Sequence, residues 1–193
     1  LVLGPANSAK AGEVLGAYAA ARRRGALLVV PTALDAEHYA RELADQGTVL
    51  GGVLTFGGLA REIAQRTGYL DAPLSPVQRR QIVKRIVGRE KPRGYAIVAE
   101  NLIAELERTL VTPERFANAL PHGEASDLYR RYAAALDRIG RPDADLRAWR
   151  ALDALRADPG RWGDTPVFFY GFDDFSGIER DAIETLSRVV GVE

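Results

Sequence analysis

The sequence predicts an α/β fold in which a parallel sheet, flanked by helices, is interrupted by a large all-helical insertion. Three observations lead to this prediction. Short apolar runs alternate with amphipathic helices over residues 1–70, the pattern of β-α-β units with parallel strands. Residues 71–161 have helical periodicity only, and an aromatic-rich strand pattern returns at residues 166–175. We therefore expect an α/β domain of residues 1–70 and 162–193 and a helical subdomain of residues 71–161.

Composition limits the function classes. The chain has 193 residues, of which 47% are hydrophobic, enough for a packed core. Its 26 basic and 26 acidic residues cancel, so nucleic-acid binding would need a local basic patch. Cysteine is absent, which excludes disulfides and cysteine-ligated metals. No apolar run approaches the roughly 20 residues of a membrane span, so we expect a cytoplasmic protein without a membrane partner.

Both ends of the chain have strand character. The chain starts with Leu1-Val2-Leu3 and has no methionine, and it ends on the apolar run Val189-Val190-Gly191-Val192. We therefore expect the sequence to be the N-terminal piece of a longer protein.

The first ten residues have the layout of a phosphate-binding loop. In the motif G-x-x-x-x-G-K-[ST], backbone amides surround the phosphates, the lysine neutralises them and the hydroxyl holds Mg²⁺. Gly4, Ser8 and Lys10 are the candidate nucleotide-binding residues, but Ala9 replaces the second glycine and Ala11 replaces the hydroxyl residue. We expect no cofactor, or at most weak binding of ATP with Mg²⁺. The alternative is an ordinary turn between a strand and a helix.

The remaining strands of the first 70 residues follow in order. A helix ends on the arginines at 22–24, an apolar strand covers residues 26–30, and a second helix covers 34–44. A weaker strand at 48–54 precedes a helix at 59–67, for which Thr55 is the expected N-cap, with Phe56 beside it. Because parallel strands end at one edge, Thr32, Thr55 and Phe56 are expected there with the loop.

The helical insertion carries the chain's basic cluster. Helices are expected at 77–87, at 95–110, from Thr112, from Ser126 to Gly140, and around 146–155. The first of these contains Arg79, Arg80, Lys84 and Arg85. These cations either follow a nucleic-acid backbone or form a solvated face paired with the acids of the next helix, Glu100, Glu105 and Glu107.

Acidic residues follow the last expected strand. Asp173 and Asp174 are candidates for holding Mg²⁺, because a carboxylate in this place does so in P-loop NTPases. Adjacent side chains on a strand point to opposite sides, so a paired carboxylate site is not expected. A final helix is expected to begin near Ser176.

The order of these motifs resembles the first domain of superfamily 1 DNA helicases of the UvrD/RecB kind. More closely, the chain resembles the N-terminal part of AddB/RexB-type subunits of bacterial helicase-nucleases. The resemblance rests on the lysine loop and three further segments: Leu27-Leu28-Val29-Val30-Pro31-Thr32, Val53-Leu54-Thr55-Phe56-Gly57-Gly58-Leu59-Ala60 and Tyr170-Gly171-Phe172-Asp173-Asp174-Phe175-Ser176. It implies a P-loop NTPase-like fold with a 1A-like α/β domain and a 1B-like helical insertion.

The resemblance also implies a function in double-strand-break repair and recombination. The chain would bind DNA, as a single strand or a duplex end, through Thr32, Thr55, Phe56 and the cations Arg79, Arg80, Lys84 and Arg85. It would dock an AddA/RexA-like partner subunit, and a PD-(D/E)XK exonuclease domain would lie further along the protein. Helicases of this kind have Asp-Glu where this chain has Gly171-Phe172, so the domain is expected to be a degenerate scaffold that does not hydrolyse ATP and whose single-strand binding falls steeply with salt.

Two other functions stay open. One is an active P-loop NTPase or helicase domain that binds MgATP through Lys10 and Asp173 or Asp174. The other is a purely structural module whose helical insertion binds another protein.

Overall fold

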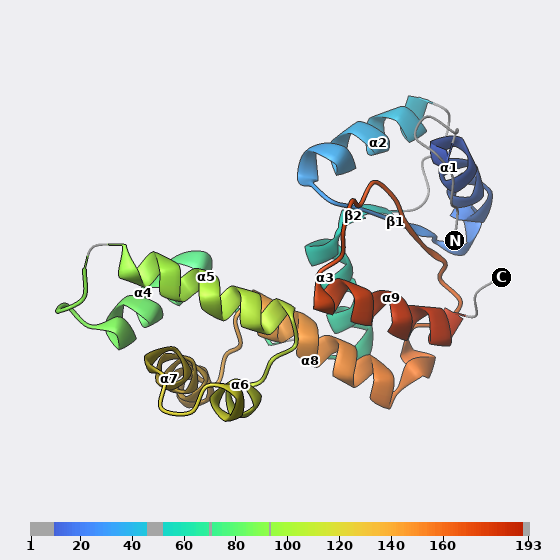
Figure 1. The fold of residues 1–193 in the computed structure, drawn as a ribbon. Helices are drawn as coiled ribbons and strands as arrows, with labels where there is room; N and C mark the ends of the chain where they lie inside the picture. The colour runs from blue at the N-terminus through green and yellow to red at the C-terminus, as the bar shows by residue number, and fades with distance from the viewer. Residues whose placement is uncertain (1–9, 46–51, 70, 93, 191–193) are drawn as a thin grey trace.

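A computed structural model describes residues 10–45, 52–69, 71–92 and 94–190, and it has a mixed α/β architecture (Figure 1). The expected α/β class with a parallel sheet is confirmed. In chain order the elements are α1 (Lys10–Ala21), η1 (Arg22–Arg24), β1 (Leu27–Val30), α2 (Ala33–Asp45), β2 (Gly52–Thr55), α3 (Phe56–Thr67), α4 (Pro76–Val87), α5 (Tyr95–Arg108), α6 (Pro113–Ala119), α7 (Glu124–Ile139), α8 (Ala144–Ala157), η2 (Pro159–Arg161), β3 (Val167–Phe169) and α9 (Gly177–Val190).

The described strands form a parallel sheet in the order β2-β1-β3. Val29 in the central strand lies opposite Leu54 of β2 and Phe169 of β3. All four residues of β1 are buried, because helices cover both faces of the sheet. The strand expected at residues 1–3 lies outside the described residues.

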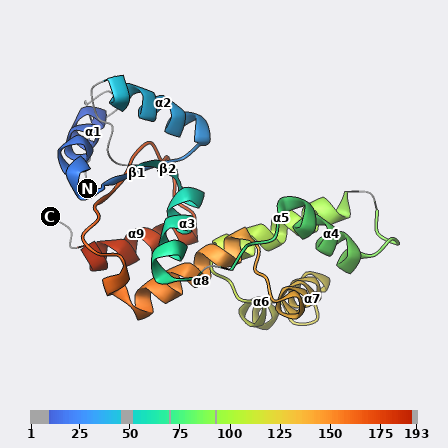
Figure 2. The same ribbon diagram turned by 180° about the vertical axis from the view of Figure 1, so that it is seen from behind.

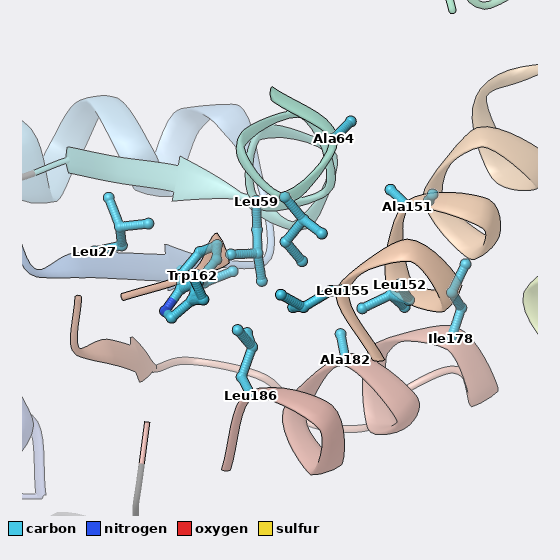
Figure 3. Packing of buried hydrophobic residues seen from close by; sticks show 13 residues of the cluster. Leu27, Leu59, Ala64, Ala151, Leu152, Leu155, Trp162, Ile178, Ala182 and Leu186 are labelled. Carbon is cyan, nitrogen blue, oxygen red and sulfur yellow. The ribbon is translucent and has the colours of Figure 1, made fainter. Parts of the chain in front are cut away.

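Alternate residues of β1 pack into two different apolar clusters. On one face Leu28 and Val30 pack with Tyr18 of α1 and Leu43 of α2. On the other face Leu27 and Val29 join a larger core formed with α3, α8 and α9 (Figure 3). The period of two along the strand therefore divides one apolar run between two layers of helices.

Trp162 anchors the larger core (Figure 3). Its side chain is only 1% exposed, and its indole Nε1 donates a hydrogen bond to the Thr165 carbonyl at 2.9 Å. The Arg66 guanidinium lies 4.3 Å from the centre of the ring. Its Nη1 also donates to the Trp162 carbonyl at 2.7 Å, so this arginine ties α3 to the segment that leads into β3.

Helices α4, α5, α6 and α7 form a separate lobe beside the sheet (Figures 1 and 2). Its core contains Val83, Ile103, Tyr132 and Leu136. Helix α8 lies in the range expected for the insertion, and it packs against α3 and α9 under the sheet. Helices α5 and α8 thus join the helical lobe to the sheet.

One helix start differs from the expectation. Helix α7 begins at Glu124, not at Ser126. Ser126 lies inside the first turn, where its hydroxyl is buried and donates to the Leu120 carbonyl at 2.8 Å. The serine therefore ties α7 back to the end of α6 instead of capping α7.

None of the helices that the structure describes is long and apolar enough to cross a membrane.

Candidate functional site

The carboxyl ends of the three described strands lie at one edge of the sheet. Val30 at the end of β1 is in register with Thr55 at the end of β2, and β3 ends beside them at Phe169. Thr32, Phe56 and the segment after β3 therefore share this edge, where parallel sheets commonly bind ligands. Gly4 and Ser8 of the expected phosphate loop lie outside the described residues. Lys10 is the first residue of α1.

Thr32 begins helix α2 through a reciprocal pair of hydrogen bonds with Asp35. The Thr32 hydroxyl and amide donate to Asp35 Oδ2 at 2.6 and 3.1 Å, and the Asp35 amide donates back to the Thr32 hydroxyl at 3.1 Å. This is the geometry of a capping box. Thr32 is exposed, and the cap places the Asp35 carboxylate at the edge.

Thr55 and Phe56 also have local structural roles. The Thr55 hydroxyl accepts a hydrogen bond from the Gly58 amide at 3.4 Å, as expected of the N-cap of α3. Phe56 is the first residue of that helix and packs against the core beneath the sheet. Both side chains are half-buried, so a ligand would meet their outer surface only.

Three phenylalanines cluster where β3 leads into α9. The rings of Phe172 and Phe175 stack with their centres 4.8 Å apart, and Phe169 lies 6.3 and 6.4 Å from them. Gly171 turns the chain after the strand with φ at 83°, a conformation that favours glycine. The sequence predicts a strand pattern over residues 166–175, but β3 covers only Val167–Phe169, and the three-residue spacing of the phenylalanines is the sequence signal for the cluster.

Asp173 and Asp174 lie in this loop and not on the strand. Both are exposed. Asp174 Oδ1 accepts a hydrogen bond from the Phe175 amide at 2.7 Å and lies 3.6 Å from Arg180 Nη2. In the described ranges, no group of three histidine, aspartate or glutamate side chains is arranged to hold a metal ion. The two aspartates thus contribute negative charge to the edge.

An exposed leucine completes this surface. Leu34, in the first turn of α2, is 75% exposed. Asp35 is next to Leu34 in the chain, Asp173 and Asp174 lie in the loop after β3, and Arg180 of α9 lies beside Asp174. Such a surface repels phosphate, whereas its leucine and phenylalanine side chains suit the flat, apolar faces of bases.

The basic residues of α4 lie on the helical lobe, away from this edge (Figures 1 and 2). Arg80 pairs with Glu100 of α5 at 3.1 Å. Lys84 and Arg85 are exposed, and neither has a carboxylate within ion-pair distance among the described residues. The structure therefore does not bring the expected DNA-binding cations together with Thr32, Thr55 and Phe56.

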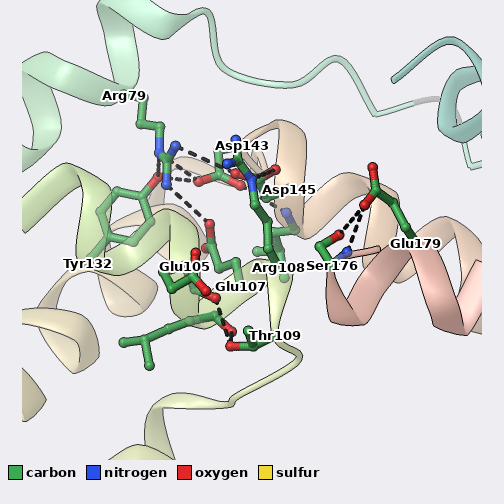
Figure 4. A network of polar contacts seen from close by, with 12 residues as sticks. Arg79, Glu105, Glu107, Arg108, Thr109, Tyr132, Asp143, Asp145, Ser176 and Glu179 are labelled. Carbon is green, nitrogen blue, oxygen red and sulfur yellow. Dashed lines mark hydrogen bonds and ion pairs between the residues drawn. The ribbon is translucent and has the colours of Figure 1, made fainter. Parts of the chain in front are cut away.

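Arg79 points into the protein and forms a buried polar network (Figure 4). Its side chain is 14% exposed and lies 3.1 Å from Asp143 Oδ2 and 3.3 Å from Glu107 Oε2. The Tyr132 hydroxyl donates to the same Asp143 oxygen at 2.6 Å. Burial, and then the neighbouring Asp143, raise the pKa of Glu107 to about 10, so Glu107 is a neutral acid at pH 7. This network joins α4, α5 and α7 to the N-cap of α8.

The contacts of Arg79 with Glu107 and of Arg80 with Glu100 agree with the expected alternative in which cations of this helix pair with acids of the next. The sequence did not reveal the burial of Arg79 or its contacts with Tyr132 and Asp143, which are far along the chain. Asp143 also caps α8 by accepting a hydrogen bond from the Leu146 amide at 2.9 Å. No protein-family model matches the chain, and no curated protein matches it. The functional proposals therefore rest on the sequence motifs and on the geometry of the described residues.

Proposed function

We propose that this chain is a helicase-like scaffold module of a helicase-nuclease acting in double-strand-break repair in the cytoplasm. It contacts single-stranded DNA and docks a motor subunit of the AddA/RexA kind without hydrolysing ATP itself. The observation that carries the proposal is the shared edge of Thr32, Thr55-Phe56 and the Phe172-Phe175 stack. These are the three strand-end segments on which the resemblance to AddB/RexB-type subunits rests.

The proposed fold assignment is a P-loop NTPase-like domain with a helical insertion. The parallel sheet with helices on both faces supports it, as does the insertion of α4 to α8 between α3 and β3. Replacement of the second glycine by Ala9 and of the hydroxyl by Ala11 supports the absence of hydrolysis. So does the position of Asp173 and Asp174 in an exposed loop, four and five residues after the end of β3.

The chemistry of the edge defines the kind of DNA contact. With three carboxylates at the edge, backbone phosphates gain little there, and the favourable contacts are with unpaired bases. Leu34 and Phe172 supply apolar surface for those bases. Binding is therefore specific for single strands. It depends only shallowly on salt, with a log–log slope of about −1 or less in magnitude, in contrast to the steep dependence expected from a basic patch.

Fluorescence anisotropy with a labelled oligothymidylate tests this proposal. The Leu34→Glu variant adds a charge at the edge, where the start of α2 tolerates an acid, and we expect it to weaken binding by about tenfold, or 1.4 kcal/mol. The control is Ile139→Glu, which changes another exposed apolar side chain, at the end of α7 on the helical lobe. Equal affinities for wild type, variant and control would reject the edge as the DNA site.

The rival function, an active NTPase, has its own test. A fluorescent ATP analogue is titrated into the wild type and into Lys10→Ala, with and without Mg²⁺. Our proposal predicts no Mg-dependent binding that requires Lys10. Binding that depends on both would favour the NTPase and displace the scaffold interpretation.

A further inference from the structure

A hollow of about 680 Å³ lies on the helical lobe, between the end of α4 and the start of α5. Its apolar lining includes Val87 and Ile97, and its basic lining consists of Lys84, Arg85, Arg89 and Lys91. The volume is within the range of about 300–1,000 Å³ that is typical of binding pockets. Of the four cations, Lys91 pairs with Glu124, whereas none of the carboxylates that the structure describes pairs with the other three.

Three exposed aliphatic side chains lie on the same two helices, and one of them, Ile97, lines the hollow. Val77 on α4 and Ile97 and Val98 on α5 are 69%, 57% and 66% exposed. In the described part of the chain they account for three of the six large hydrophobic side chains that face solvent, the others being Leu34, Leu120 and Ile139. Ile97 therefore adds exposed apolar surface beside the cations of the hollow, as at an interaction surface.

The combination of these features points to protein and away from nucleic acid. Single-stranded DNA is bound by cations interleaved with aromatic rings that stack on bases, but none of the residues that line the hollow is aromatic. Aliphatic side chains rimmed by unpaired cations instead match an amphipathic helix that presents leucine-like residues and flanking carboxylates. We propose that this hollow docks an acidic amphipathic helix of a partner protein.

The proposal is independent of the DNA-binding edge. The hollow lies between the end of α4 and the start of α5, at the tip of the helical lobe that is remote from the sheet, whereas the edge lies at the carboxyl ends of the strands (Figure 1). A partner helix bound at the hollow therefore leaves Thr32 and Leu34 accessible. Failure of one proposal does not imply failure of the other.

The test uses a labelled helical peptide in which leucines recur every three or four residues and glutamates occupy the remaining face. A second peptide has the same composition in scrambled order. Binding to the whole 193-residue chain is measured by anisotropy. We expect the ordered peptide to bind more tightly than the scrambled one, and Lys84→Glu combined with Arg85→Glu to weaken its binding by at least about tenfold.

Two further variants separate apolar docking from charge attraction. Ile97→Ser removes an exposed apolar contact and is expected to weaken ordered-peptide binding several-fold, with the same thermal midpoint as the wild type. The matched control is Arg115→Glu with Arg138→Glu, two exposed cations outside the hollow, and it is expected to bind as wild type does.

Several outcomes would overturn the proposal. They are equal binding of the ordered and scrambled peptides, no effect of Ile97→Ser, and no binding of the ordered peptide at millimolar concentration. If the Lys84 and Arg85 reversals abolish oligothymidylate binding and leave peptide binding unchanged, the hollow is a nucleic-acid site. Leu34→Glu, which tests the edge, is expected to leave peptide affinity unaltered.

Discussion

Replacing Glu107 by glutamine tests the buried network of the helical lobe most directly. The Glu107 side chain is 3% exposed, and its pKa is raised to about 10 by burial and by Asp143. A carboxyl group whose pKa is higher in the folded protein stabilises the fold fully below its unfolded pKa of about 4.5. That stabilisation is lost as the pH rises from about 5 towards 10. Glutamine does not ionise, so Glu107→Gln carries no such loss.

The expected magnitude follows from the number of protons involved. One proton changes the free energy of unfolding by at most about 1.4 kcal/mol per pH unit. Because Glu107 shares the site with Asp143 and Arg79, we expect the free energy of unfolding of the wild type to fall by less than this for each pH unit. Relative to the wild type, Glu107→Gln should become more stable by about 2 kcal/mol between about pH 6 and pH 8.

Urea denaturation at several pH values measures this difference. All other titrating groups are common to the two proteins, so subtracting the two curves isolates Glu107. The control is Glu105→Gln, an exposed position on the same helix, for which no pH-dependent difference is expected. Parallel curves for the wild type and Glu107→Gln would mean that Glu107 is ionised beside Arg79, and would refute the reasoning.

Two further stability predictions follow from the buried side chains. Arg79→Met leaves the buried Asp143 carboxylate without its cation. The free energy of unfolding should therefore fall by about 3–5 kcal/mol at neutral pH. A loss below about 1 kcal/mol, measured by urea denaturation, would contradict this. Trp162→Ala removes the largest fully buried side chain of the sheet core and its bond to the Thr165 carbonyl, so a loss of about 3–5 kcal/mol is expected. Retention of the wild-type denaturation midpoint would show that the core refills the space.

The functional surfaces could be predicted only in part from the sequence. Strand-end residues such as Thr32 and Thr55 could be placed at one edge, because parallel pairing by itself determines where strands end. The stack of Phe172 on Phe175 and the exposure of Leu34 could not be foreseen, because they depend on how the chain turns after β3 and on what covers α2.

Local patterns in the sequence determined most of the elements. Apolar runs specified β1 and β3, amphipathic periodicity specified the helices, and Gly68 and Gly140 ended α3 and α7 with φ at 75° and 69°. Each of these signals depends on residues that are close together in the chain, so the elements could be predicted without knowledge of the tertiary structure.

Only the tertiary structure decided what the charges of α4 do. Arg79 and Lys84 belong to the same run of cations, yet Arg79 turns inward to Asp143 and Glu107 while Lys84 faces solvent at the hollow. Their separation arises from the packing of α4 against α5 and α7 and from the approach of α8, whose cap is 64 residues further along the chain than Arg79. A charge acquires its role from the partners that folding brings within a few ångströms, and those contacts are not encoded in local spacing.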